Sequence, residues 1–341
     1  MNYEAPWWLP GGNLQTIWSA KLARSLTQSA AANPPQFRRE RWAAPDGDFV
    51  DVDYLVGPAN ATAENPRQQA LVVLFHGLEG SSQSHYALAM AAWCQQHGLA
   101  FAVPHFRGCS GELNHAPRAY HSGDFEEIGW ILQRLKMQHS AAKNGQVVGP
   151  VLALGVSLGG NALLRWAEEA GEQASKTVAS VASVCSPIDL AASGHAIGQG
   201  FNRLVYTRMF LNSMKPKALQ KLAQHPGLFD RSAMLASRDL YEFDNIVTAP
   251  IHGFRDTDDY WHRASAKPHL HQIRIPALVV NALNDPFVPK TSLPGPAQVG
   301  THVTLWQPPQ GGHVGFAAGG FPGHLRTIPE TVGGWLVSHS K

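Results

Sequence analysis

The chain has 341 residues, of which 44% are hydrophobic and 15% are charged, and its formal net charge is +2. This length allows a large buried core, either in one catalytic domain with an insertion or in two domains, and the small net charge argues against nucleic-acid binding. Three widely spaced cysteines argue against a disulfide framework. The chain has no signal-peptide pattern and no apolar run near about 18 residues, so we expect a soluble, cytoplasmic protein.

The N-terminal segment 6–18 is rich in aromatic residues and contains Trp7, Trp8 and Trp18. These rings could dip into a membrane interface, or they could pack on the main domain and line one wall of a pocket. We favour the second interpretation because basic residues begin only at Lys21. Residues 25–35 are rich in Ser, Ala, Asn and Pro and predict a linker.

Two strands, 38–42 and 49–56, are predicted next, joined by a Pro-Asp-Gly-Asp turn at 45–48. In the second strand, polar and apolar residues partly alternate, which suits a half-exposed antiparallel pair. Residues 60–69 are polar and predict a loop.

Strands and helices then alternate along the chain. The predicted strands are 70–75, 99–104, 151–156 and 178–185, and the predicted helices are 86–96 and one that begins near Asp124. The helix after Asp124 has one apolar face, formed by Phe125, Ile128, Leu132 and Leu135. Strand 70–75 is apolar throughout, as expected where both faces are buried. This alternation predicts an α/β fold, a mostly parallel central sheet with helices on both faces.

The alternation stops near residue 190. Residues 191–271 show a helical pattern and predict an inserted helical cap, while strands at 275–282 and 303–307 and a helix at 328–339 resume the earlier pattern. The predicted core is therefore 1–190 and 272–341, including an N-terminal tryptophan-rich segment at 1–35, and the cap is 191–271.

A possible nucleophile lies where strand 151–156 meets the next helix. Gly155-Val156-Ser157-Leu158-Gly159 fits G-x-S-x-G, a sharp strand-to-helix turn that exposes the serine hydroxyl. Apolar residues at helical spacing follow it: Ala162, Leu163, Trp166, Ala167 and Ala170. An ordinary strand–turn–helix with an incidental serine is the alternative.

A serine nucleophile needs a base, usually His, and a carboxylate that orients it; in this turn type both follow the serine in the chain. Asp285 follows strand 275–282, and Asp189 is its main rival. Among seventeen histidines, His313 stands out because it follows the last strand between glycines. The weaker candidates for acid and base are Asp256, Asp258, Asp259, His302 and His324.

Negative charge that develops on the substrate needs two backbone N–H donors. One should come from Leu158 and the other from Leu78 in the loop after strand 70–75, where we interpret His76 as a structural hydrogen-bonding residue. The sequence contains no paired metal motif, and His269-x-His271 alone is weak. The glycine-rich stretch 311–323 lacks a Walker lysine. The sequence therefore implies no metal and no cofactor.

Seven segments together resemble one family. They are Trp8–Thr16, His76–Ser81, Phe106–Gly111, Tyr120–Gly123, Gly155–Asn161, Asp285–Phe287 and Gly311–Phe316. Nearly end to end, the chain resembles the YheT-like branch of the alpha/beta-hydrolase superfamily, which is related to eukaryotic abhydrolase-domain proteins that include phospholipases. The resemblance implies a serine carboxylesterase-type hydrolase with Ser157, Asp285 and His313 as its charge-relay residues. One departure is Glu127, where the family usually has aspartate.

These observations predict a serine hydrolase that cleaves carboxylic esters of short-to-medium acyl chains through an acyl-enzyme. The expected partner is a small-molecule ester, with no nucleic acid and no stable membrane insertion. Two alternatives stay open. One is a phospholipase or other lipid-handling esterase in peripheral contact with a membrane through Trp7, Trp8 and Trp18, and the other is a catalytically silent ligand-binding protein on the same fold.

Overall fold

An eight-stranded sheet forms the centre of the computed structural model, which describes residues 1–23, 34–57, 70–141 and 149–340. The strands are β1 (Phe37–Ala43), β2 (Phe49–Leu55), β3 (Leu71–Phe75), β4 (Ala100–Pro104), β5 (Val151–Val156), β6 (Ser180–Val184), β7 (Ala277–Val280) and β8 (Val303–Trp306). Their order is β1-β2-β4-β3-β5-β6-β7-β8; β1 and β2 are antiparallel, β2 and β4 are antiparallel, and the remaining pairs are parallel. Most of the predicted linker at 25–35, and all of the loop at 60–69, lies outside the described residues.

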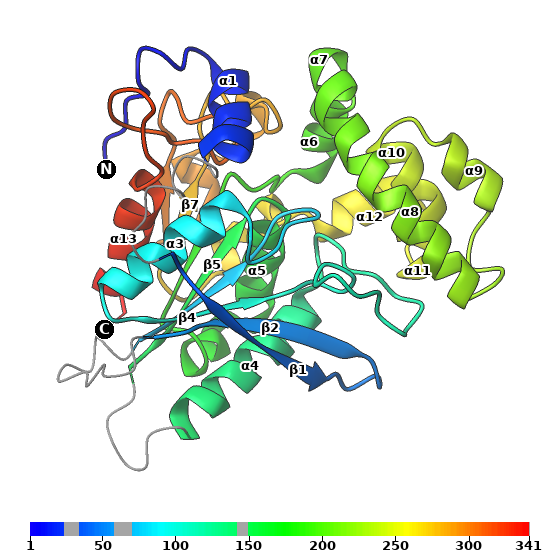
Figure 1. Ribbon diagram of the computed structural model, residues 1–341, viewed down its shortest axis with the longest axis horizontal. Coiled ribbons are helices and arrows are strands. Elements are labelled where there is room, and N and C mark those ends of the chain that lie inside the picture. Colours follow the sequence, from blue (N-terminus) through cyan, green and yellow to red (C-terminus); the bar gives the residue numbers. More distant parts are fainter. Residues whose placement is uncertain (24–33, 58–69, 142–148, 341) are drawn as a thin grey trace.

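Helices cover both faces of this sheet, as the sequence predicts (Figure 1). On one face lie α3 (His85–Gln96) and α13 (Gly334–Ser338), and on the other lie α4 (Phe125–Ala141) and α5 (Leu158–Ala170). Successive residues of a strand point to opposite faces, so Val72 and Leu74 pack with the first pair and Val73 and Phe75 with the second. Strand β3 is buried on both faces, which confirms the prediction from its apolar sequence.

The prediction that β2 is half-exposed is wrong. Its first five residues are all buried, including Asp51 and Asp53. Arginines on the adjacent strand cover these carboxylates: Arg41 Nε lies 2.8 Å from Asp51 Oδ1, and Arg39 Nε lies 2.7 Å from Asp53 Oδ1. Burial alone would raise the pKa of Asp53, but hydrogen bonds from Arg39 and other donors hold it well below its ordinary value. Polar residues can therefore lie in a buried strand when a neighbouring strand supplies the counter-charge.

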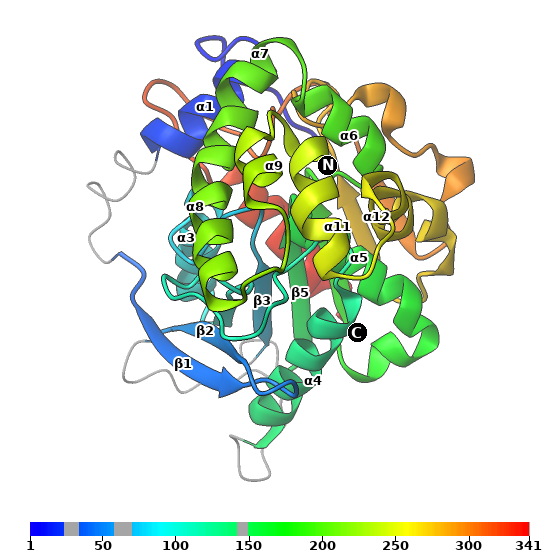
Figure 2. The ribbon, with the colours of Figure 1, turned by 90° about the vertical axis from the view of Figure 1, so that its right-hand side faces the viewer.

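Between β6 and β7 the described chain is helical. It forms α6 (Leu190–Ile197), α7 (Gly200–Asn202), α8 (Arg208–Gln224), α9 (Arg231–Ala236), α10 (Leu240–Phe243), α11 (Ala249–Ile251) and α12 (Thr257–Ala264). We call α6–α12 the insert helices. They gather at one end of the molecule in Figure 1 and face the viewer in Figure 2. The limits 191–271 for a separate cap stay a prediction.

A short N-terminal helix, α1 (Gly12–Ile17), packs on the loops that follow β7 and β8 (Figure 1). The approach is close: a Cβ added to Gly12 would lie 1.9 Å from the carbonyl oxygen of Asn284, and one added to Gly312 would lie 2.6 Å from the carbonyl oxygen of Gly12. Glycine at these two positions lets α1 approach the chain on either side of β8.

Candidate active site

Ser157 stands at the sharp turn between β5 and α5. Its φ angle is 53°, in the left-handed region that residues with a Cβ rarely adopt. The turn has no room for side chains at its flanking glycines: a Cβ on Gly155 would lie 2.4 Å from Gly160 Cα, and one on Gly159 would lie 2.4 Å from the His76 carbonyl oxygen. The sequence G-x-S-x-G is therefore a steric requirement of this turn, which presents the serine hydroxyl to a cavity.

Two loops bring an acid and a base to this serine. Ser157 Oγ lies 3.0 Å from His313 Nε2, and His313 Nδ1 lies 2.9 Å from Asp285 Oδ2. The other carboxylate oxygen of Asp285 accepts hydrogen bonds from the backbone N–H groups of Phe287 (2.8 Å) and Val288 (3.3 Å). The Phe287 ring packs on the imidazole of His313, with ring centroids 4.1 Å apart. The three predicted residues thus form a continuous hydrogen-bonded chain.

The rival candidates lie elsewhere. Asp189 caps α6, accepting a hydrogen bond from the Ala192 N–H (3.1 Å), and its other carboxylate oxygen lies 3.4 Å from Lys267 Nζ. His324 pairs through its backbone with Ala318, and His302 is exposed. Asp256 caps α12. Within the described residues, the hydrogen-bonded partners of the His313 imidazole, Asp285 and Ser157, are the ones that the sequence favours.

Backbone strain is concentrated around these residues. The described non-glycine residues with positive φ are Glu79, Ser157, Cys185, Val314 and Phe316. Val314 follows His313, and its N–H donates to Cys185 Sγ at 3.2 Å. Strained backbone persists where surrounding contacts fix it, and it clusters at functional sites. No sequence pattern indicated a role for Cys185, because its contact with the His313 loop is made only in the folded chain.

The N-terminal helix joins the acid loop to the base loop. Gln15, fully buried, accepts hydrogen bonds at Oε1 from the Gly311 N–H (2.9 Å) and from Asn284 Nδ2 (3.0 Å). Thr16 Oγ1 accepts a hydrogen bond from the His313 N–H at 2.8 Å. Sequence reasoning missed this role, although Gln15 and Thr16 belong to the first segment of the family resemblance.

The prediction that the N-terminal tryptophans pack on the main domain is confirmed for Trp8 and Trp18, but the prediction that they line one wall of the pocket is wrong. Trp18 is buried and packs edge-on against Trp8, and neither lines the cavity that contains Ser157. Trp8 also donates a hydrogen bond to the Gly319 carbonyl, while Trp7 is 90% exposed. The polar residues of α1, rather than the tryptophans on either side of it, reach the site.

The two residues predicted to supply the oxyanion-binding N–H groups, Leu158 and Leu78, line the cavity that contains Ser157. Leu158 begins α5, so its N–H has no partner within the helix. The Gly77 carbonyl accepts hydrogen bonds from His76 Nδ1 (2.8 Å) and from the Gly80 N–H (2.9 Å). Because a trans peptide points N–H and C=O in opposite directions, these contacts turn the Leu78 N–H away from them. Both leucines line the cavity, as an oxyanion-binding pair would require.

His76 helps to hold the backbone at Gly77 and Leu78 in this orientation. It is fully buried, and its Nε2 accepts a hydrogen bond from the Phe106 N–H at 3.1 Å while its Nδ1 donates to Gly77. Burial lowers the pKa of His76 to about 3, so the ring is neutral near pH 7 and can keep both roles. This geometry is consistent with the structural role predicted for His76.

Cys185, Asp285 and His313 bring potential metal-ligand atoms within 4.8 Å of one another. A metal needs the thiolate form of cysteine, whereas burial raises the pKa of Cys185 well above its ordinary value. Both nitrogens of His313 already have partners, Asp285 and Ser157. The donor set therefore fits a hydrogen-bonded chain better than a metal site.

The cavity at Ser157 lies between the sheet and the insert helices. Its volume is about 1370 Å³ when the part that opens to solvent is counted. Its apolar lining from the insert helices includes Leu190, Ile197, Phe210, Met214, Phe243, Val247 and Ile251. Ser157 and His313 thus face a mainly apolar space, which suits a hydrocarbon chain.

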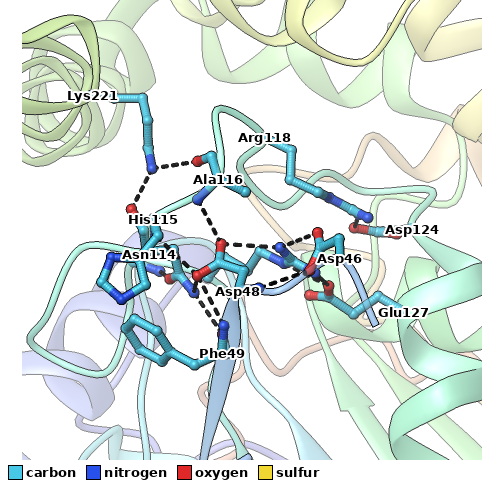
Figure 3. Close-up of polar contacts among 12 residues, drawn as sticks. Asp46, Asp48, Phe49, Asn114, His115, Ala116, Arg118, Asp124, Glu127 and Lys221 are labelled. Carbon is cyan, nitrogen blue, oxygen red and sulfur yellow. Dashed lines mark hydrogen bonds and ion pairs between the residues drawn. The ribbon is translucent and has the colours of Figure 1, made fainter. Parts of the chain in front are cut away.

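An ionic cluster, buried except at Asp46 and partly at Arg118, lies beside this cavity (Figure 3). Its carboxylates are Asp46, Asp48, Asp124 and Glu127, and its cations are Arg107, Arg118 and Lys221. Arg107 contacts the first two and Glu127, with a 2.6 Å ion pair to Glu127 Oε2. Lys221, on α8, donates to the carbonyls of Asn114 (2.6 Å) and Ala116 (2.7 Å). The cluster thereby links an insert helix to the core.

Two members of the cluster, Glu127 and Arg118, each have a buried side-chain atom that has no hydrogen-bond partner among the described residues. In Glu127 this atom is Oε1. Burial and the nearby Asp124 raise the pKa of Glu127 to about 7, against the opposing effect of Arg107. The departure from the family pattern at this position therefore places a buried carboxyl with a raised pKa beside the cavity.

Comparisons with known proteins agree on the fold family of the chain. The model of the alpha/beta hydrolase fold family matches residues 70–319. The chain is 36% identical to the Escherichia coli (strain K12) protein named "Putative esterase YheT", over 90% of this chain and 88% of that one. It is 26% identical to phospholipase ABHD3 of Mus musculus, over 89% of this chain and 72% of that one.

The solved structure of the 2,6-dihydroxy-pseudo-oxynicotine hydrolase resembles the chain with a TM-score of 0.54 at 15% identity, over 97% of this chain and 76% of that one. No helix in the described part of the chain is both long enough and apolar enough to cross a membrane.

Proposed function

The chain belongs to the alpha/beta hydrolase fold family, in its YheT-like branch, and from this premise we propose that it is a serine hydrolase that cleaves carboxylic esters. The proposal assigns Ser157 as nucleophile, His313 as general base and acid, and Asp285 as the group that orients His313. The acyl chain, of short-to-medium length, occupies the cavity between the sheet and residues 191–271, which we take as a cap. The cytoplasmic location stays a prediction.

In the proposed reaction, Ser157 Oγ attacks the ester carbonyl while His313 Nε2 takes its proton. The N–H groups of Leu158 and Leu78 stabilise the negative oxygen of the tetrahedral intermediate. Collapse breaks the bond to the alcohol, which leaves with the proton from His313. Water, activated by His313, then hydrolyses the acyl-enzyme and regenerates Ser157. Asp285 stabilises the imidazolium that forms in both halves.

The observation that carries this proposal is the chain of contacts from Ser157 through His313 to Asp285, with distances of 3.0 and 2.9 Å. A serine hydroxyl is a weak nucleophile unless a base lies this close. The apolar cavity next to the hydroxyl supports a hydrocarbon acyl group as substrate.

A lipid-handling esterase is the second candidate, and one surface feature favours it. Trp7 is 90% exposed and Phe321 is 78% exposed, and the Phe321 ring packs edge-on against Trp8. Exposed aromatic side chains insert readily at a lipid–water interface. Co-sedimentation with anionic vesicles separates the two candidates: bound protein favours the lipid surface, and unbound protein favours a soluble ester.

Labelling with a fluorophosphonate, followed by peptide mapping, tests the proposal. We expect an adduct on Ser157 in the wild type, none in Ser157→Ala, and an unchanged adduct in Ser193→Ala, which alters another serine of the same cavity. Hydrolysis of a nitrophenyl ester should follow the labelling. A folded wild type that takes no label and cleaves no ester would favour the catalytically silent alternative.

A further inference from the structure

Glu79 directly follows Leu78 in a tight turn. The Gly80 N–H donates to the Gly77 carbonyl at 2.9 Å, and Glu79 has a φ of 57°. This is the left-handed region, which glycine or asparagine usually occupies at such a turn position. Glutamate does not favour this conformation, so we infer that the contacts of the Glu79 side chain hold the turn.

The contacts of Glu79 extend in two directions. Within the core, its N–H donates to the Tyr120 hydroxyl at 3.0 Å, and that hydroxyl donates to Glu79 Oε1 at 3.0 Å. Burial raises the pKa of Tyr120 well above its ordinary value, so the hydroxyl keeps its proton and can serve both bonds. Toward α8, Glu79 Oε2 accepts a hydrogen bond from Ser213 Oγ and forms an ion pair with Lys217 Nζ at 2.7 Å.

Helix α8 connects these contacts to the cavity. Ser213 and Lys217 are four residues apart, so they lie on one side of the helix. Met214 and Ala218, one residue further along in each case, line the cavity, as does Lys217 itself. An acyl chain in the cavity therefore touches the same helix that holds the Glu79 carboxylate, which is only 10% exposed.

We propose that Glu79 is a positioning residue that couples the docking of α8 to the direction of the Leu78 N–H. When α8 is docked, Ser213, Lys217 and Tyr120 together hold the carboxylate and fix the strained turn. When α8 moves away, the carboxylate loses two of these donors, and the turn relaxes from the geometry that an oxyanion requires. The inference rests on the proposed esterase function, because it assigns a role in that reaction.

Three variants test this coupling. Ser213→Ala removes one donor and does not change a cavity-lining residue; Lys217→Met removes the ion pair; Glu79→Gly removes the side chain while relieving the backbone strain. The matched control is Lys215→Met on the same helix, because among the described residues Lys215 donates to the Leu235 and Ser237 carbonyls, both within the insert. The measurements are kcat and KM for a nitrophenyl ester, inhibition by a trifluoromethyl ketone with the same acyl chain, and thermal unfolding.

We expect each variant to lower kcat by about 5- to 100-fold with KM within about threefold, since complete loss of an oxyanion donor costs about 10²–10³ in kcat. Affinity for the ketone, whose adduct carries the oxyanion, should fall in parallel. Glu79→Gly should lose kcat even if its unfolding temperature is unchanged, which a purely structural role would not produce. Lys215→Met should match the wild type.

The inference is overturned if the three variants raise KM with kcat intact, or if they behave as Lys215→Met does. Fluorophosphonate labelling of wild-type Ser157 distinguishes this failure from that of the proposed function. A labelled, active wild type with unaffected variants removes only the role of Glu79. A folded wild type without label or activity removes the esterase function and the role of Glu79 with it.

Discussion

Asp285 shows how backbone contacts at a single residue can prepare a side chain for one task. Its side chain is fully buried, one carboxylate oxygen accepts two backbone N–H groups, and the other faces His313 Nδ1. The first oxygen is thus fixed by its own loop, which leaves the second to select the tautomer of the imidazole. A negative charge in this position also stabilises the imidazolium that forms when Ser157 loses its proton.

Asp285→Asn should therefore lower kcat for ester hydrolysis by about 10³–10⁴-fold, because an amide can hold His313 in the wrong tautomer. KM should change little, since Asp285 does not line the cavity. The measurement is steady-state kinetics with a nitrophenyl ester. Asp189→Asn is the matched control and should stay within a few-fold of the wild type. A loss of less than tenfold in Asp285→Asn would assign the acid role to another residue.

At the scale of an element, α1 supports the site although it lies far from it in sequence. Gln15 joins the Gly311 and Asn284 loops, and Thr16 holds the backbone N–H of His313. Thr16 Oγ1 also donates to the Gly12 carbonyl at 2.7 Å, so the hydroxyl lies between its own helix and the base loop. A helix of six residues thereby restrains the loops that carry both the acid and the base.

Thr16→Val keeps the shape of the side chain but removes the acceptor for the His313 N–H. We expect kcat to fall by about 3- to 30-fold, and the free energy of unfolding to drop by about 1–3 kcal/mol, because a buried N–H loses its partner. Enzyme kinetics and urea unfolding check both quantities. Leu14→Ala, which changes an exposed residue of the same helix, should alter neither. Equal losses of kcat in the two variants would argue against a specific role for Thr16.

At the scale of the whole molecule, the ionic cluster of Figure 3 joins the turn before β2, the 105–118 loop, α4 and α8. Asp124 and Glu127 are both buried carboxyl groups of this cluster, and the negative charge of Asp124 adds to the cost of ionising Glu127. Two neighbouring negative charges are costly in a buried region, and protonating one carboxyl relieves this cost. Glu127, with an unpartnered oxygen and a pKa raised to about 7, is that carboxyl.

This arrangement predicts a pH dependence of stability with a definite sign. In the folded protein Glu127 keeps its proton up to about pH 7, whereas in the unfolded chain it loses it near 4.5. The folded state therefore binds more protons between these values, so its stability should fall as pH rises through this window, by up to about 3 kcal/mol. Glu127→Gln should reduce this dependence in urea unfolding at pH 5 and pH 8.

The exposed neighbour Glu126 supplies the control. Glu126→Gln should retain the wild-type difference between pH 5 and pH 8. If Glu127→Gln retained it as well, the proton would have to reside on another member of the cluster.

Much of the fold could be predicted because local patterns agree with it. Strand β3 (Leu71–Phe75) is apolar on both faces, which is typical of a strand in the middle of a sheet. Gly155 and Gly159 indicate the sharp turn at Ser157, because a side chain at either position would clash with the backbone. The half-exposed prediction for β2 failed because alternation cannot reveal that Arg39 and Arg41 on another strand bury Asp51 and Asp53. The prediction that the tryptophans line a pocket failed for a similar reason: aromatic content indicates burial, but it does not indicate the surface on which a ring packs.

By itself, the sequence determined the α/β architecture, the nucleophile turn and the order of candidate acid and base, because these depend on periodicity, steric limits at glycine and position after a strand. Only the tertiary structure decided which residues, distant in sequence, contact the nucleophile turn and the loops of the acid and the base. Gln15 and Thr16 reach the His313 loop, Cys185 lies behind it, and Glu79 joins the Leu78 turn to α8. Such contacts join residues up to 297 positions apart, and their distances depend on how the sheet, the loops and the insert helices pack together.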